Sequence, residues 1–138
     1  AVAVIERGGR WLRFGPGADL VDLRGGSWHV EGDLEVLEAT VKDGRLRSET
    51  YPDPLGRVWS ALGSPHAGDF ILSLEPGYEA VDWGGVSHAG GGSHGALHAG
   101  DSLGPLLFVG CGPDDPGARE QWALRDVAPA VLAHFELC

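Results

Sequence analysis

A glycine- and histidine-rich stretch from residue 83 to residue 101 sets the strongest limit on how this chain can fold. It contains seven glycines and three of the six histidines. Glycine at this density lets the backbone adopt positive φ angles and approach a ligand closely, and imidazole side chains bind metal ions and titrate near neutral pH. Because such a segment packs poorly, we expect it to serve chemistry and the flanking sequence to form the scaffold.

Length and charge restrict the classes of protein to which the chain can belong. Its 138 residues suit a domain with a single sizeable core, and its 23 glycines and 9 prolines predict long loops. The net charge is −10, and lysine and arginine form no basic run. A nucleic-acid duplex is therefore not expected as a partner, because duplex binding depends on neutralising phosphates with basic side chains.

Cysteine use and hydropathy bear on location. The two cysteines, Cys111 and Cys138, form neither a CxxC pair nor a disulfide framework. No apolar run approaches the roughly 18 residues of a membrane span, and no signal peptide is visible, so we expect no membrane association and favour a cytoplasmic location. The chain starts at Ala1 and contains no methionine, which we interpret as a sign of a processed or excised piece.

The first 50 residues predict a small antiparallel β unit. Ala1–Ile5 and Trp11–Phe14 are joined by a Gly-Gly turn, and Lys42–Arg45 has the Asp-Gly signature of a second hairpin. Two segments leave alternatives open, namely a short strand or a turn at Leu20–Leu23, and a strand or a short helix at Leu34–Leu37.

Helix and strand signals continue beyond this unit. Asp53 and Pro54 predict a helix start, with Asp53 as the capping side chain. The apolar face of this helix, which includes Trp59 as a core residue, is Leu55, Val58, Trp59 and Leu62. Two apolar runs of strand length predict buried strands, and an apolar stretch after Asp126 predicts a final helix; these segments are Phe70–Leu74, Pro105–Val109 and Arg125–Phe135.

His94 is the strongest candidate for a metal ligand. It lies between Ser93 and Gly95, whose small side chains leave the imidazole room to reach an ion. A local zinc site of His88, His94 and His98 with a carboxylate stays open as an alternative, although HExxH spacing is absent. No GxSxG or P-loop motif is present either, so the sequence offers no self-contained nucleophile or phosphate loop.

Two sequence blocks carry a resemblance to a known family. Gly92–Gly95 reads G-S-H-G and is followed by Asp101 and the apolar run Pro105–Gly110. Asp126–Leu132 reads D-V-A-P-A-V-L. Both are similar to the last core blocks of the alkaline phosphatase superfamily, in its type I phosphodiesterase/nucleotide pyrophosphatase branch, where the second block is D-[IV]-A-P-T-[IV]-L. Ala130 replaces the usual threonine.

The resemblance implies a metal-dependent hydrolysis of phosphate esters. The family holds two metal ions, usually zinc, and the histidine of its G-x-H-G element is a metal ligand, which assigns that role to His94. The resemblance assigns no role to His88 or His98; apart from it, we expect His88, His98 and Asp101 near the substrate. The family's nucleophile, its first metal-binding aspartate and its D-H-G element have no counterpart here. The chain is therefore expected to be inactive alone, to hold no metal stably, and to need the missing N-terminal part of a parent protein.

These inferences combine into a mixed α/β fold with two parts. Residues 1–67 are expected to form a β-rich, cap-like unit with one helix, and residues 68–138 the last strands and helix of an α/β/α sandwich. The alternative is a non-catalytic binding or interaction module that keeps the fold elements. A fragment should expose Phe70–Leu74 and Pro105–Val109 as open sheet edges or cover them in a homodimer, whereas a module should cover them itself.

Overall fold

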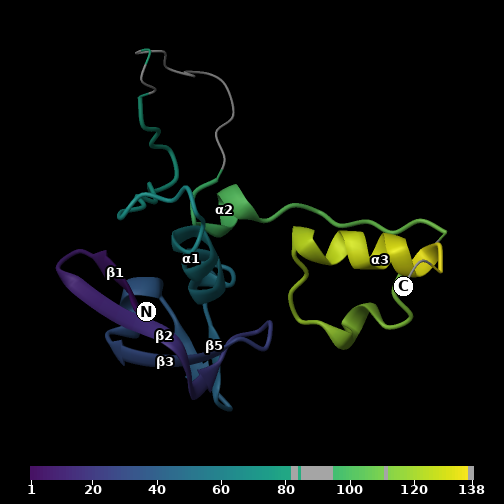
Figure 1. Ribbon diagram of the computed structural model, residues 1–138, viewed down its shortest axis with the longest axis horizontal. Helices are drawn as coiled ribbons and strands as arrows, with labels where there is room; N and C mark the ends of the chain where they lie inside the picture. The colour runs from purple at the N-terminus through teal and green to yellow at the C-terminus, as the bar shows by residue number, and fades with distance from the viewer. Residues whose placement is uncertain (82–83, 85–94, 111, 137–138) are drawn as a thin grey trace. The chain divides into compact units, whose positions relative to one another are not determined.

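The computed structural model describes residues 1–81, 84, 95–110 and 112–136. Contacts divide the chain into two compact units, Ala1–Leu103 and Gly104–Cys138, which are considered separately below (Figure 1). The sequence predicts a boundary after residue 67, whereas the contacts place it after Leu103, because residues 96–102 are bonded to the first unit.

The N-terminal unit is built on a mixed five-stranded sheet. The strands are β1 (Ala3–Arg7), β2 (Arg10–Val21), β3 (Ser27–Gly32), β4 (Thr40–Lys42) and β5 (Arg45–Arg47). The order is β1-β2-β5-β4, and β3 also pairs with β2. All pairings are antiparallel except that of β2 with β5, which rests on Val21 opposite Arg45. The chain thus has the predicted mixed α/β character, with its described strands all within the first 47 residues.

Both predicted hairpins are confirmed. Gly8 and Gly9 connect β1 to β2 with φ angles of 61° and 78°. Asp43 and Gly44 connect β4 to β5 with φ angles of 53° and 72°. Positive φ at both central residues is the geometry of a tight hairpin turn whose twist matches that of the strands, which explains the glycines.

Helical elements settle two further expectations. Leu34–Leu37 forms a 3-10 helix, η1, so the helical alternative holds there. The predicted helix is α1 (Pro54–Leu62), with proline in its first turn. The prediction that Asp53 caps it is wrong: Asp53 has a left-handed φ of 46° and makes no side-chain cap bond. Its carboxylate lies instead 3.7 Å from Nε of Arg24, and both side chains are buried.

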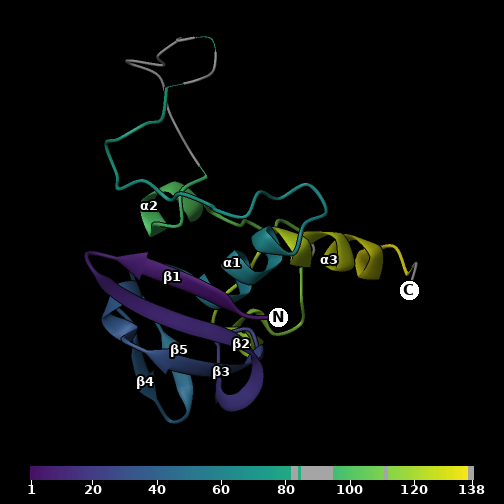
Figure 2. The same ribbon diagram turned by 60° about the vertical axis from the view of Figure 1, so that its left-hand side comes forward.

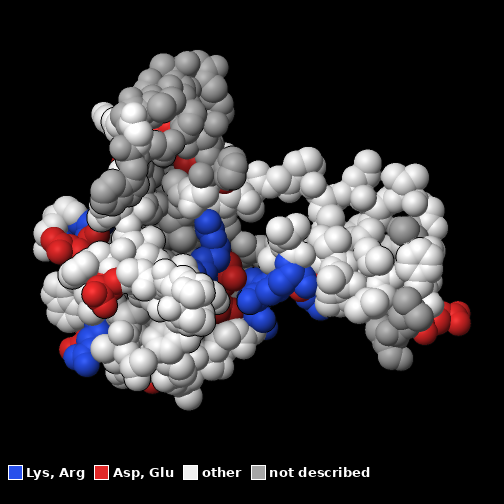
Figure 3. All heavy atoms as spheres, turned by 45° about the horizontal axis from the view of Figure 1, so that its top comes forward, with Lys and Arg blue, Asp and Glu red and all other residues white. Residues whose placement is uncertain are grey.

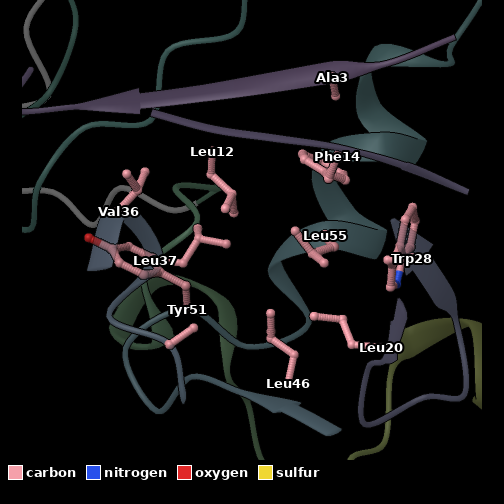
Figure 4. Packing of buried hydrophobic residues seen from close by; sticks show 11 residues of the cluster. Ala3, Leu12, Phe14, Leu20, Trp28, Val36, Leu37, Leu46, Tyr51 and Leu55 are labelled. Atoms are coloured by element: carbon pink, nitrogen blue, oxygen red, sulfur yellow. The ribbon is translucent and has the colours of Figure 1, made fainter. Parts of the chain in front are cut away.

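Figure 2 shows α1 beside the sheet, and the core of the N-terminal unit takes side chains from both. Leu55 of α1 lies among Phe14, Trp28 and Leu20 in Figure 4. Half-buried Trp59 packs against this core, and its ring centroid is 6.0 Å from that of Trp28. The eleven buried apolar residues are Ala3, Leu12, Phe14, Leu20, Trp28, Val36, Leu37, Ala39, Leu46, Tyr51 and Leu55.

The two predicted buried strands are wrong. Phe70–Leu74 and Pro105–Val109 have no strand structure, and among the described residues no strand follows Arg47. Phe70 and Leu72 are 90% and 88% exposed, and Leu107 and Val109 are 82% and 80% exposed. An apolar run becomes a buried strand only when a neighbouring strand pairs with it and a second layer covers it. The described part of the chain supplies neither for these runs.

The C-terminal unit contains the predicted final helix. Its elements are the 3-10 helices η2 (Pro116–Ala118) and η3 (Leu124–Asp126) and the α-helix α3 (Val127–His134). Asp126 immediately precedes α3 but gives it no side-chain cap bond. Its buried carboxylate instead accepts hydrogen bonds from the Ala123 N–H and from Arg119. The sequence predicts an apolar face of Val127, Val131, Leu132 and Phe135 for this helix; Val127 is half-buried and the other three are exposed.

The fold class is therefore mixed α/β, without the sandwich strands that the resemblance implies among the described residues. Within the same residues, no helix combines the length and the apolar character needed to cross a membrane.

Candidate functional site

The predicted site residues fall in two groups. His88 and His94 lie outside the described residues. His98 and Asp101 lie at the short helix α2 (Ala99–Ser102), which belongs to the N-terminal unit. The structure therefore describes two of the four candidates, His98 and Asp101, which lie near each other at one end of the glycine-rich stretch.

His98 uses one ring nitrogen to cap α2. Its Nδ1 accepts a hydrogen bond of 3.0 Å from the backbone N–H of Gly100. A ring nitrogen that accepts such a bond carries no proton, so a neutral ring has its proton on Nε2. Coordination of a metal through Nε2 would move this proton to Nδ1 and break the cap. In this conformation the imidazole acts as a capping group beside the ring of Tyr51, 6.1 Å away between centroids.

Asp101 lies half-buried in the first turn of α2, where its backbone N–H donates to the carbonyl of His98 at 3.1 Å. Among the described residues, no group of three or more histidine, cysteine, aspartate or glutamate side chains is arranged to hold a metal ion. The alternative of a local three-histidine site depends on His88 and His94 and stays a prediction.

Arg57, on α1, is the functional candidate that sequence reasoning missed. Its Nη1 donates to the carbonyls of Leu97 (2.8 Å) and Pro52 (3.2 Å). Its Nη2 donates to the carbonyl of Ala96 (3.1 Å) and to Oγ of Ser102 (2.8 Å). Burial lowers the pKa of the Arg57 guanidinium, and the negative charge of Asp53 opposes this shift. The side chain therefore fastens the segment around α2 to α1.

Other contacts fasten the same segment. The N–H of Ala99 donates to the carbonyl of Thr50 at 2.7 Å, and the N–H of Leu97 donates to Oγ of Ser73 at 2.9 Å. The side chain of Leu97 packs against the hydrophobic core. Ser102 Oγ lies 2.7 Å from the carbonyl of His98, to which its hydroxyl can donate. Residues 96–102 are thus held by backbone, side-chain and apolar contacts together.

A charged cluster lies beside Tyr51 and His98. Glu38 accepts hydrogen bonds from Thr50 (2.7 Å) and Arg7 (2.6 Å), and these bonds, in that order, lower its pKa. Arg7 also lies 3.1 Å from Glu75 and over the ring of Tyr51. The bond to Glu38 raises the pKa of Arg7, and burial raises that of Tyr51.

In this cluster one arginine, Arg7, pairs with two carboxylates, those of Glu38 and Glu75. Acidic and basic side chains are both present on the face of the N-terminal unit drawn in Figure 3. The described role of the cluster is to join β1, η1 and the segment that contains Tyr51.

The chain was also compared with known proteins. No protein-family model, no curated protein and no solved structure matches it.

Proposed function

We propose that this chain is the C-terminal segment of a metal-dependent phosphoric ester hydrolase, similar to the phosphodiesterases of the alkaline phosphatase superfamily, and that it is inactive alone. The observation that carries the proposal is the order of two motifs. G-S-H-G at residues 92–95 precedes D-V-A-P-A-V-L at residues 126–132, as in the last core blocks of that family. The helix α3, which begins within the second motif, agrees with this alignment.

His94 supplies one ligand of a two-metal site in this proposal. Two divalent ions, zinc in most such enzymes, activate the nucleophile and stabilise the charge that develops on the phosphoryl oxygens. The Ser or Thr nucleophile and the other ligands come from the part of the protein that precedes this chain. Because a neutral imidazole alone holds zinc weakly, the isolated chain is expected to bind no metal stably.

Exposed apolar side chains give the proposal physical support. Phe70, Leu72, Leu107 and Val109 are all at least 80% exposed, at the positions where the resemblance calls for buried strands. Side chains of this kind are stabilised by about 1.5–3 kcal/mol each when they become buried. The missing part of a sandwich would supply strands to pair with these segments and helices to cover them. These apolar side chains are exposed, as a fragment predicts. The segments that carry them are not strands, however, so they do not form the open sheet edges that a fragment also predicts.

Reconstitution tests the proposal. We would co-express the chain with the N-terminal remainder of its parent and assay hydrolysis of bis(p-nitrophenyl) phosphate, with each part alone as a blank. We expect activity from the complex, and from the complex with His66→Ala, an exposed histidine that serves as the matched control. His94→Ala should abolish activity and release about one of the two metal ions, as measured by elemental analysis. The proposal fails if the intact parent does not hydrolyse the diester.

One observation favours a second candidate, a non-catalytic binding module. The N-terminal unit buries eleven apolar residues in one cluster, and a core of its own is what a self-contained module requires. This candidate predicts that the chain alone unfolds cooperatively, and that the intact parent neither binds zinc nor hydrolyses a diester. The reconstitution experiment therefore separates the two functions.

A further inference from the structure

The cap at the start of α2 is made by a side chain that can gain a proton near neutral pH. Nδ1 of His98 accepts the backbone N–H of Gly100 at 3.0 Å. This acceptor position at a helix start is usually held by an oxygen of serine, threonine, asparagine or aspartate, and those oxygens remain acceptors across neutral pH. An ordinary histidine gains its proton between about pH 8 and pH 5, and both of its ring nitrogens are then donors. The first turn of α2 therefore rests on an acceptor that acid can remove.

Protonation of His98 is incompatible with the capped geometry. A proton on Nδ1 would point at the N–H of Gly100, so that two donors would face each other across 3.0 Å. The ring must then turn away, and the Gly100 N–H loses its side-chain acceptor. α2 has only four residues, and the bond from the Leu103 N–H to the carbonyl of Ala99 (2.9 Å) closes its single turn. Because a helix of one turn has no interior, loss of the cap weakens all of it.

The surroundings of the ring offer negative charge to an imidazolium. The titratable and charged groups on the elements around it, and on α2 itself, are Tyr51, Arg7, Glu38, Glu75, Arg57, Asp53 and Asp101. Arg7 pairs with the carboxylates of both Glu38 and Glu75. Arg57 bonds to the same segment from α1, where it interacts with the opposite charge of Asp53. The acids of this group outnumber the two arginines, so a positive charge on the ring improves the balance.

We propose that His98 is a pH-sensitive switch for α2: its neutral ring caps the helix, and its protonated ring releases the cap and turns toward the carboxylate of Glu38. The direction follows from proton binding, since the released state takes up a proton at Nδ1 that the capped state excludes. The capped state therefore prevails above the titration of the ring and is lost as the pH falls through it. Hydrogen bonds from Thr50 and Arg7, followed by the charges of Arg7 and His98, lower the pKa of Glu38, so this carboxylate is within electrostatic range of the ring. The switch does not depend on the function proposed above.

The switch can be tested with the chain as it is, by NMR between about pH 8 and pH 5. At the higher pH the ring nitrogens of His98 should show the tautomer with its proton on Nε2, and the amide hydrogen of Gly100 should have the shift of a bonded donor. As the ring gains its second proton, the Gly100 signal should move with the same midpoint. The Leu103 N–H should exchange about 5-fold faster at the lower pH, after correction for the intrinsic rate, because loss of one helix cap changes stability by about that factor. A Gly100 signal that does not follow the titration of His98 would overturn the proposal.

Two substitutions at the cap separate the switch from other effects of pH. His98→Asn keeps an acceptor oxygen that does not titrate, so Gly100 should stay bonded and its signal should stay constant across the same pH range. His98→Ala has no acceptor and should show the released state throughout. His66→Ala removes an exposed histidine elsewhere and is the matched control, which should titrate as wild type. A Gly100 signal that still depends on pH in His98→Asn contradicts the switch.

Glu38→Gln tests where the charged ring goes. Glutamine keeps an acceptor for Thr50 but carries no charge, so the protonated ring loses its acidic partner. The pH midpoint of the Gly100 signal should therefore fall by about half a unit, a small shift because this carboxylate is exposed. Glu31→Gln removes the same charge at an exposed position in β3 and should leave the midpoint where it is. Equal midpoints in these two variants would overturn the movement toward Glu38.

Discussion

Both units of this chain are rich in apolar side chains, but they use them differently. In the N-terminal unit eleven apolar residues form one buried cluster. In the described residues of the C-terminal unit no apolar side chain is buried, and the buried residue there is Asp126. Hydrophobic content alone therefore does not make a core. Elements must also present matching apolar faces to each other, as β2 and α1 do with Phe14 and Leu55.

The helix α3 shows why the second unit lacks such a face. Its sequence, V-A-P-A-V-L-A-H, is apolar on nearly all sides. A helix of this type is usually buried in a larger structure, whereas a helix on the surface of a small domain has one apolar stripe. α1 has such a stripe, and Leu55 points into the core from it. The contrast agrees with the proposal that α3 completes its packing with another part of a longer protein.

The largest loss of stability is expected for a substitution in the core of the N-terminal unit. Phe14→Ala removes a fully buried aromatic ring that contacts Trp28, and it should lower the free energy of unfolding by about 3–5 kcal/mol, as large-to-small core substitutions do. Leu107→Ala, in the C-terminal unit, removes an apolar side chain that is 82% exposed, and it should change stability by less than about 0.5 kcal/mol. Urea denaturation followed by tryptophan fluorescence measures both. A large loss for Leu107→Ala would mean that the apolar side chains of the C-terminal unit are packed after all.

Substitution of the two buried aspartates, Asp22 in the N-terminal unit and Asp126 in the C-terminal unit, should cause a smaller loss of stability. Asp22 accepts hydrogen bonds from two backbone N–H groups and from Nε1 of Trp28. Asp22→Ala leaves the buried indole donor without its acceptor and should cost about 2–3 kcal/mol. Asp126→Ala, which frees the Ala123 N–H and Arg119, should cost about 1 kcal/mol.

The urea midpoints of the two variants should differ because each aspartate lies in a different unit. For Asp22→Ala the urea midpoint should fall. For Asp126→Ala it should stay constant, while amides of α3 exchange faster. A fall of the urea midpoint in both variants would show that the units unfold together, which would break the comparison.

The smallest effect concerns Glu38 and pH. Hydrogen bonds from Thr50 and Arg7 lower the pKa of this carboxyl below its ordinary value of 4.5. A lowered pKa in the folded state stabilises the protein above the ordinary pKa, and this stabilisation disappears as the pH falls through the lowered value. Thermal midpoints should therefore fall less between pH 5 and pH 3 for Glu38→Gln than for wild type. The control Glu31→Gln, at an exposed position in β3, should behave as wild type.

Local signals explain which elements the sequence could predict. The Gly-Gly and Asp-Gly turns, and Pro54 at the start of α1, determine their own conformations within a few residues. Burial of Phe70–Leu74 and Pro105–Val109 depends instead on partners elsewhere, so an apolar run of the right length predicted strands that the described chain does not form. Asp53 has the right residue type for a cap, but its left-handed backbone and its proximity to Arg24 direct the side chain elsewhere.

The candidate site was predictable to a similar extent. The metal role of His94 rests on a resemblance alone and remains a prediction. His98 could be identified as a candidate, but its use of Nδ1 as a cap follows from the backbone of α2. Arg57 carries no sequence signal, because an arginine that binds carbonyls 39 and 40 residues away has no fixed spacing and no acidic partner to suggest it.

The exposed segment Phe70–Leu74 has a consequence for the handling of the isolated chain. Its sequence, F-I-L-S-L, is uncharged, contains no proline and has a high tendency to form β structure, which are the properties of segments that stack into cross-β assemblies. Asp69 and Glu75 flank it as gatekeepers, whose charges oppose stacking of identical copies. Glu75 also pairs with Arg7, which neutralises part of that repulsion. Two acidic side chains at the ends of these five residues therefore oppose self-association of the isolated chain through this segment.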